Sequence, residues 1–275
     1  MEKYRGRIAP TPTGFLHLGH AKTFALAARR CREAAGTLVL RIEDIDVVRC
    51  KKEFATAAME DLRALGIAWD EGPDCGGDFA PYVQSQNTEY FLQIWARLRD
   101  GGFIYPCRRS RKDVAAAPRA PHDNDDNAEP IFPAEWRPAE KDFGKNFAEP
   151  GDWNWRFRVP DGERISFRDE LCGEQSFVAG RDFGDFVVWR RDGIPAYELA
   201  VVADDIRMKI TEVVRGRDLL KSTARQILLY RALAATIPKW AHAPLVLDAV
   251  GRRLAKRDDA LSVRAILAAG GKIEI

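Results

Sequence analysis

Cysteine is scarce and scattered in this sequence of 275 residues. The five cysteines are odd in number and none forms a C-x-x-C pair; they are Cys31, Cys50, Cys75, Cys107 and Cys172. This pattern argues against a disulfide framework and against a zinc knuckle. It is typical of a reducing compartment, so we predict a cytoplasmic location.

Long apolar runs and an excess of one charge are also missing. No apolar stretch approaches the roughly 20 residues of a bilayer span, and the N-terminus lacks the apolar core of a signal peptide. The 43 basic residues nearly balance the 41 acidic ones, leaving a formal charge of +2. A contact with nucleic acid would therefore need a local basic patch. The absence of G-x-G-x-x-G argues against a dinucleotide enzyme.

The composition, 46% hydrophobic and 31% charged, is that of a globular protein with an ample core. Residues 5–105 alternate short apolar runs with helical periodicity, which is typical of βα units around a parallel sheet. We predict strands at 7–9 and 37–43 and helices at 19–35, 51–65 and 88–98.

The middle of the chain differs. Five prolines between positions 118 and 138, together with an Asp/Asn run at 123–127, predict an exposed loop and not core. Later strands are expected at 155–159, 165–167, 186–190, 194–202 and 210–214, followed by a helix at 223–235. A hairpin turn at Asp192 and Gly193 would join the third and fourth of these strands. Two α/β halves, 1–105 and 185–275, thus flank an antiparallel, loop-rich insert at 106–184.

The segment 7–20, RIAPTPTGFLHLGH, is the most informative. Its prolines and Gly14 break a strand, and His17 and His20 follow three residues apart where a helix begins, so both imidazoles can share one face. A helix start also offers unpaired backbone N–H groups and the positive end of the helix dipole. These features predict a phosphate site. A lone histidine is more often an ordinary surface residue, but this context favours the site.

The extended stretch RIAPTPTGFLHLGHAKT resembles the HIGH signature of class I aminoacyl-tRNA synthetases, in the form found in the glutamyl and glutaminyl branch. RLAKR at 253–257 is similar to the lysine loop of the same class, although alone it is typical of a solvated basic loop. LRIEDID with Glu43, PAYELAVVADD with Tyr197 and ITEVVRGRDLL with Arg215 also match. The resemblance implies a Rossmann-like α/β catalytic core with an inserted acceptor-type subdomain and no anticodon-binding domain.

That resemblance implies ATP-dependent, tRNA-independent activation of L-glutamate to glutamyl-adenylate. The nucleophile in that reaction, the carboxylate of glutamate, is already ionised. The enzyme therefore needs to supply only positioning and hydrogen-bond donors for the phosphate oxygens. By resemblance the catalytic residues are His17, His20 and Lys256. The ATP site comprises Pro10, Thr11, Gly14, His17, Gly19, His20, Arg253, Leu254, Ala255, Lys256 and Arg257. Mg²⁺ would arrive with the substrate, held by phosphates and water.

A substrate with two carboxylates needs guanidinium partners, because arginine binds carboxylate through a bidentate fork. The resemblance assigns this role to Arg7 and Arg215, and assigns the α-ammonium to Glu43. Ala9, Thr11 and Tyr197 complete the expected glutamate site. Without the resemblance, each of these would more often be a surface ion pair or a core tyrosine.

Full-length members of this branch append an anticodon-reading domain after the lysine loop, whereas only a short tail follows Arg257 here. In this shorter form the sequence resembles the glutamyl-queuosine tRNA(Asp) synthetases. These stand-alone paralogues place glutamate on the base queuosine in the anticodon loop of tRNA(Asp). Two residues agree with that resemblance: Val201 replaces an asparagine and Leu219 replaces an aromatic residue of the full-length members. The resemblance implies L-glutamate, ATP and queuosine-containing tRNA(Asp) as partners, no membrane, and a monomer.

Two departures from that family bear on the prediction. The paralogues often bind zinc through C-x-C and a later tyrosine and cysteine, but only Cys107 matches here, while Phe132 and Trp136 occupy the downstream places. One ligand cannot close a tetrahedral site, so we predict no structural zinc. In the lysine loop, Ala255 replaces the usual serine, which removes a hydroxyl and keeps Lys256.

More than one acceptor of the glutamyl group fits these residues. Candidate contacts to an anticodon stem-loop, equally explained as a solubilising face, are Arg108, Arg109, Arg111, Lys112, Arg252, Arg253 and Arg257. One alternative is a glutamyl-tRNA synthetase catalytic domain that charges a tRNA 3′ end. Another is a non-catalytic synthetase-like protein that binds nucleotide or tRNA.

Overall fold

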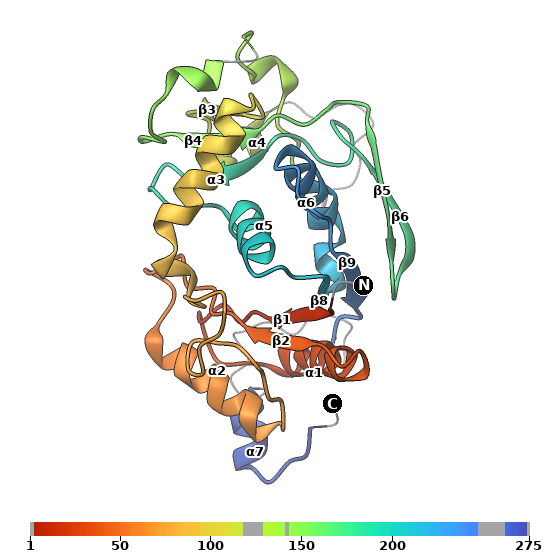
Figure 1. Cartoon of the computed structure of the whole chain (residues 1–275). Helices are drawn as coiled ribbons and strands as arrows, with labels where there is room; N and C mark the ends of the chain where they lie inside the picture. The colour runs from red at the N-terminus through yellow and green to blue at the C-terminus, as the bar shows by residue number, and fades with distance from the viewer. Residues whose placement is uncertain (1–2, 118–128, 141–142, 247–261, 274–275) are drawn as a thin grey trace.

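Two parallel strand pairs form the centre of the protein in the computed structural model, which describes residues 3–117, 129–140, 143–246 and 262–273 (Figure 1). Strand β1 (Arg5–Ile8) runs parallel to β2 (Thr37–Leu40), and β8 (Glu212–Gly216) runs parallel to β9 (Lys239–Ala243). The amide of Thr211 donates to the carbonyl of Arg5 at 2.9 Å, which joins the two pairs at the start of β1 and β8. The parallel α/β organisation predicted for the first hundred residues is confirmed.

Helices cover both faces of these strands. Helix α1 (Leu18–Glu33) packs on β1, β2 and β8 through a buried stripe that includes Phe24, Ala28 and Cys31. In Figure 1, α1 lies on one side of β1 and β2, while α5 (Tyr197–Arg207) and α6 (Leu220–Ala232) lie on the other. The remaining α-helices are α2 (Lys52–Ala64), α3 (Thr88–Asp100), α4 (Arg111–Ala116) and α7 (Val263–Ala268). Within the ranges described, no helix has the length and apolar character that crossing a membrane requires.

Antiparallel strands build the part between the two halves. Strands β3 (Ile104–Cys107), β4 (Asn154–Phe157) and β7 (Phe186–Trp189) form one sheet in that order. A hairpin of β5 (Arg164–Asp169) and β6 (Gly173–Val178) joins β9 through a parallel pairing of Asp169 with Trp240. Short 3₁₀ turns occur at Gln84–Gln86, Ala134–Trp136, Phe143–Asn146 and Arg217–Leu219. The hairpin thereby extends the sheet that carries β8.

The strand predicted at 194–202 is wrong. The turn at Asp192 and Gly193 exists, and the amide of Ala196 donates to the carbonyl of Val188 at 2.9 Å, but helix α5 then begins at Tyr197. Every residue of α5 from 198 to 205 is buried. A helix buried on all sides shows a continuous apolar run and no amphipathic stripe, so its pattern cannot be distinguished from that of a buried strand.

One further expectation about the middle of the chain is wrong, and one strand next to it was not predicted. Phe132 belongs to the proline-rich stretch predicted to be exposed, yet only 3% of it is exposed, and it packs with Tyr105, Cys107 and Val114. Strand β3 was not predicted, and it contains Pro106. The residue is tolerated there because β3 is an edge strand of its sheet, where a missing N–H donor costs little.

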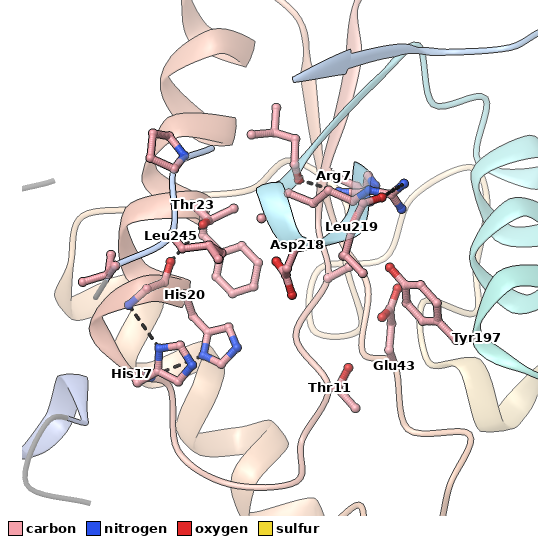
Figure 2. A pocket seen from close by; sticks show the side chains of 18 residues that line it. Arg7, Thr11, His17, His20, Thr23, Glu43, Tyr197, Asp218, Leu219 and Leu245 are labelled. Carbon is pink, nitrogen blue, oxygen red and sulfur yellow. Dashed lines mark hydrogen bonds between the residues drawn. The ribbon is translucent and has the colours of Figure 1, made fainter. Parts of the chain in front are cut away.

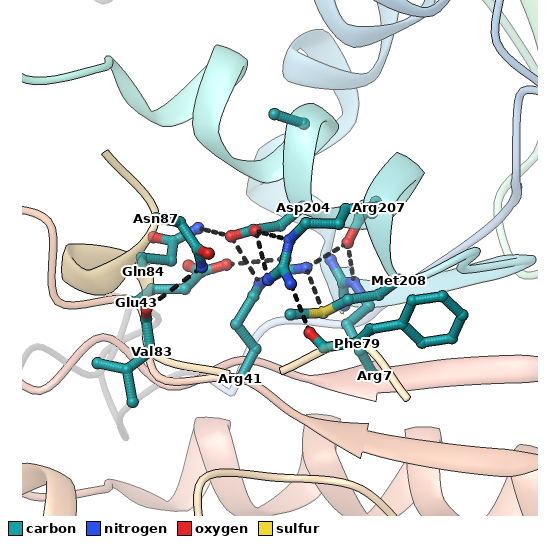
Figure 3. A network of polar contacts seen from close by, with 12 residues as sticks. Arg7, Arg41, Glu43, Phe79, Val83, Gln84, Asn87, Asp204, Arg207 and Met208 are labelled. Carbon is teal, nitrogen blue, oxygen red and sulfur yellow. Dashed lines mark hydrogen bonds and ion pairs between the residues drawn. The ribbon is translucent and has the colours of Figure 1, made fainter. Parts of the chain in front are cut away.

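A fully buried arginine ties the sheet to α5 (Figure 3). Arg41 donates from Nη1 to Asp205 Oδ1 at 2.7 Å and from Nη2 to Glu43 Oε1 at 3.1 Å. Its Nε lies 3.9 Å from Asp204 Oδ2, and that carboxylate also accepts from Gln84 Nε2 at 2.8 Å. One cation thus holds the segment after β2 against the C-terminal part of α5.

We expect Arg41→Met to lower the free energy of unfolding by about 3–5 kcal/mol, because it leaves three buried carboxylates without their shared cation. Urea denaturation would measure the change. The control is Arg49→Met, which removes an ion pair to Asp46 from a side chain that is 70% exposed. The control should lose less than about 1 kcal/mol. Equal losses in the two variants would contradict the assigned role of Arg41.

Candidate active site

The carboxyl ends of the four parallel strands open into one cavity of about 340 Å³ (Figure 2). The segments that follow β1, β2, β8 and β9 all contribute lining residues, as expected for ligand sites in open parallel sheets. Most of the predicted site residues that the structure describes line it, namely Arg7, Ala9, Thr11, His17, Gly19, His20, Glu43, Tyr197 and Arg215.

The other predicted ATP-site residues are placed differently. Pro10 and Gly14 do not line the cavity, although the carbonyl of Pro10 accepts from the amide of Glu43 at 3.0 Å and so positions that residue. Arg253, Leu254, Ala255, Lys256 and Arg257 lie outside the described residues. Both flanks of that segment are at the cavity: Val246 lines it, and Ser262 forms a β-bridge with His17.

The two histidines cap helix α1 and each other. The amide of Gly19 donates to His17 Nδ1 at 3.1 Å, and the amide of His17 donates to His20 Nδ1 at 3.3 Å. The rings stack with their centroids 3.8 Å apart. Because both Nδ1 atoms accept, these hydrogen bonds assign the hydrogen of each neutral ring to Nε2. The expected free amides at this helix start are therefore wrong for His17 and Gly19, and both amides donate to ring nitrogens instead.

Opposite charges meet at the other end of the cavity. Arg7 is buried, donates from Nη1 to the carbonyl of Val214 at 2.9 Å, and its Nη2 makes no hydrogen bond in the part of the chain that is described. Glu43 is 8% exposed, and Tyr197, the first residue of α5, is 42% exposed. Figure 2 shows these three residues on one side, the histidine pair on the other, and Asp218 between them.

Arg215 is held more tightly than the sequence suggested. Its Nε donates to His242 Nε2 at 3.1 Å, and its Nη1 donates to Gln226 Oε1 at 2.8 Å. Its Nη2 donates to Thr223 Oγ1 at 2.7 Å and to the carbonyl of Leu219 at 3.4 Å. The protein thus occupies the fork that was expected to bind a carboxylate bidentately. What Arg215 brings to the cavity in this structure is chiefly its positive charge.

Sequence reasoning missed part of the lining, above all Asp218. This residue follows the carboxyl end of β8, and that position beside a parallel strand was the signal that could have found it. A Cβ at Gly216 would lie 2.5 Å from Asp218 Oδ1, so glycine there lets the carboxylate fold close to the backbone. Other lining residues not predicted as part of the site are Thr23, Phe24, Val214, Gly216, Leu219, Pro244, Leu245 and Val246.

The surroundings of Cys107 do not fit a zinc site. The thiol is buried in a small cluster with Tyr105, Val114 and Phe132, against which Trp136 packs. Across the described ranges, no group of three or more His, Cys, Asp or Glu side chains is arranged to hold a metal ion. The absence of a structural zinc stays a prediction.

Comparison with known proteins places the chain in a class. Residues 3–270 match the family model described as tRNA synthetases class I (E and Q), catalytic domain. The chain therefore belongs to the class I tRNA synthetases of this branch, and the predicted fold class is confirmed.

Two relatives narrow the family. The chain is 47% identical over 268 residues to the Glutamyl-Q tRNA(Asp) synthetase of Symbiobacterium thermophilum, covering 96% of this chain and 81% of the relative. It is 45% identical over 267 residues to the Glutamyl-Q tRNA(Asp) synthetase of Nitratidesulfovibrio vulgaris, covering 97% and 82%. It is a member of the Glutamyl-Q tRNA(Asp) synthetase family, as the sequence predicted.

A solved structure supports the same fold. The glutamate-tRNA synthetase of Elizabethkingia anophelis superimposes with a TM-score of 0.78 at 30% identity, covering 94% of this chain. The match covers 53% of that synthetase, so the chain spans about half the length of this structural relative.

Proposed function

We propose that this protein activates L-glutamate with ATP and transfers the glutamyl group to queuosine in the anticodon loop of tRNA(Asp). The observation that carries the activation step is the cavity at the strand ends, with a histidine pair on one side and buried Arg7 and Glu43 on the other. The choice of acceptor rests on the two Glutamyl-Q tRNA(Asp) synthetases, of which the chain covers 81% and 82%. We further propose that it acts as a cytoplasmic monomer with halves at 1–105 and 185–275 around the insert at 106–184.

In the first step, an α-carboxylate oxygen of glutamate forms a bond to the α-phosphorus of ATP while the bond to pyrophosphate breaks. The Nε2–H groups assigned to His17 and His20 can donate to phosphate oxygens, and the α1 dipole favours negative charge there. Lys256 would act on the departing pyrophosphate, which is supported by the position of both flanks of its segment at the cavity. Mg²⁺ bound to the triphosphate would neutralise part of the developing charge.

The opposite end of the cavity suits a dicarboxylic amino acid. Glu43 would accept from the α-ammonium, and the Nη2 group of Arg7 would donate to the side-chain carboxylate, with the charge of Arg215 adding to the attraction. Ala9, Thr11 and Tyr197 would complete the walls. The arrangement would favour glutamate over its amide because a neutral side chain forfeits both guanidinium charges.

In the second step, a queuosine hydroxyl attacks the carbonyl carbon of the adenylate, the ester forms and AMP leaves. Docking of the anticodon loop needs cationic surface. The guanidinium of Arg108 lies 4.0 Å from the ring centroid of Trp153, and that of Arg109 lies 4.6 Å from that of Trp136. These stacked arginines and exposed Lys112 support a phosphate-contacting face on the insert. The side chain of Arg111 and the whole of Arg252, Arg253 and Arg257 lie outside what the structure describes.

Two assays test the proposed function. We expect glutamate-dependent exchange of pyrophosphate into ATP without tRNA, and transfer of labelled glutamate to tRNA(Asp) that contains queuosine. The matched control is the same tRNA(Asp) carrying guanosine at that position, which should accept none. Equal charging of unmodified tRNA(Glu) would replace the proposal with a 3′-end synthetase. Failure of the exchange would indicate a protein that binds without catalysing.

The role of His17 can be separated from its capping of α1. Asparagine is a good N-cap but carries no equivalent of the Nε2–H group, so His17→Asn should keep the free energy of unfolding within about 0.5 kcal/mol. Pyrophosphate exchange should fall by about 10²-fold, the effect of removing one donor to a developing oxyanion. Urea unfolding and steady-state exchange would measure the two quantities. Unchanged exchange would remove His17 from the phosphate site.

Glutamate binding should weaken on the acid side. Burial raises the pKa of the Glu43 carboxyl, and Arg41 and Arg7 oppose this only in part. As the pH falls through this raised pKa, Glu43 takes up a proton and the α-ammonium loses its charged partner. The KM for glutamate should therefore rise at a pH above the usual value of about 4.3 for a glutamate side chain, while Glu43→Gln should abolish the dependence. If the KM for glutamate still rose at low pH in that variant, the dependence would belong to a group other than Glu43.

A further inference from the structure

A buried chain of three side chains leads from the β5–β6 hairpin to the cavity. Asp169 at the end of β5 accepts from His242 Nδ1 of β9 through Oδ2 at 2.6 Å, and His242 Nε2 lies 3.1 Å from the donating Nε of Arg215 on β8. All three side chains are almost completely buried. Arg215 lines the cavity, whereas Asp169 and His242 do not touch it. Of these three side chains, Arg215 is therefore the one that reaches the site.

The partners of Asp169 determine which nitrogen of His242 carries the hydrogen. Asp169 Oδ1 accepts from the backbone amides of Leu171, Cys172 and His242 at 3.0, 2.8 and 3.2 Å, so only Oδ2 faces the imidazole. A carboxylate oxygen can only accept, which makes Nδ1 the donor and leaves Nε2 with a lone pair. That lone pair is what the Nε–H of Arg215 requires, since a guanidinium has no acceptor.

Neutrality of the ring is part of the same arrangement. Burial, together with the nearby Arg215 guanidinium, lowers the pKa of His242 to about 4, although Asp169 acts in the opposite direction. At neutral pH the imidazole is therefore uncharged and Nε2 is free to accept. A protonated ring would place a second N–H against Arg215, so charge and hydrogen-bond geometry select the same state.

We propose that Asp169 and His242 are positioning residues that hold the positive charge of the Arg215 guanidinium in place for the side-chain carboxylate of glutamate. The proposal rests on the proposed function of the cavity. The other sides of the guanidinium are fixed by Gln226 and Thr223, and its carbon lies 5.0 Å from the ring centroid of Trp240. His242 supplies the acceptor for the remaining Nε edge. Misplacement of a charged group that holds substrate weakens binding without removing that group.

Substitution at Asp169 can reverse the direction of its hydrogen bond to His242. In Asp169→Asn the three backbone amides require the carbonyl oxygen at the Oδ1 position, so the NH₂ group must face His242 Nδ1. The imidazole must then accept at Nδ1 and carry its hydrogen on Nε2. That hydrogen opposes the Nε–H group of Arg215 and can only turn toward Thr223 Oγ1, which lies 3.2 Å from Nε2, so Arg215 loses its acceptor. The variant keeps shape and volume and reverses only the hydrogen-bond direction.

Two substitutions at His242 form a matched pair. His242→Gln can place an amide oxygen near the position of Nε2 and keep an acceptor for Arg215. His242→Asn has an amide that reaches only the position of Nδ1, so it keeps a contact to Asp169 but loses that acceptor. The two variants differ by one methylene and should separate loss of the acceptor from loss of the ring.

The measurements are the Kd for glutamate by calorimetry, the KM for glutamate and for ATP in pyrophosphate exchange, and the thermal midpoint. We expect Asp169→Asn and His242→Asn to raise the Kd and KM for glutamate by about tenfold or more, with the KM for ATP within about twofold. His242→Gln should stay within about threefold of the parent protein. Nitrogen NMR of the histidine rings in the parent protein should show Nδ1 protonated and Nε2 unprotonated at His242.

Three results would overturn the proposal. They are Nε2 protonation of His242 in the parent protein, unchanged glutamate affinity in folded Asp169→Asn, and equal losses for glutamate and ATP in all three variants. The last would show a merely structural role. Absence of exchange in the parent protein would count against the proposed function, and the NMR assignment would still decide the orientation of His242.

Discussion

The parallel alignment of β1, β2, β8 and β9 is the constraint on which the rest of the structure depends. Parallel strands place their carboxyl ends on one edge, so residues more than two hundred positions apart, such as Arg7 and Arg215, reach the same cavity. Helix α1, which packs across both strand pairs, begins at that edge and brings the histidines to it.

The cavity rests on a layer of buried charge. Arg41 is surrounded by Glu43, Asp204 and Asp205, and a separate network of neutral and charged groups surrounds Arg215. Buried charges are costly unless paired, and the pairing here fixes the rotamers of groups that face the cavity. Glu43 belongs both to this buried layer and to the cavity wall, because it accepts from Arg41 and lines the site. Charge placement and structural support are thus provided by the same residues.

Local pattern was enough for some of this protein. The spacing of His17 and His20 predicted a shared face at a helix start, and the structure shows the rings stacked there. It did not predict that the rings themselves take up the amides of that turn, since ring orientation is not a property of spacing. The resemblance to a family predicted that Arg7, Glu43, Tyr197 and Arg215 share one site, and all four line the cavity. Helix α5 was misread as a strand because burial on every side erases the periodicity on which such predictions depend.

By itself the sequence determined the α/β class, the family and the segments that build the site, because these depend on short-range patterns and on motifs a few residues long. Only the tertiary structure decided how the donors are used. Asp169 and His242 are 73 positions apart and belong to no common motif, yet their contact at 2.6 Å sets the hydrogen-bond direction at Arg215. Such a contact depends on the packing of β5 against β9, which no local pattern encodes.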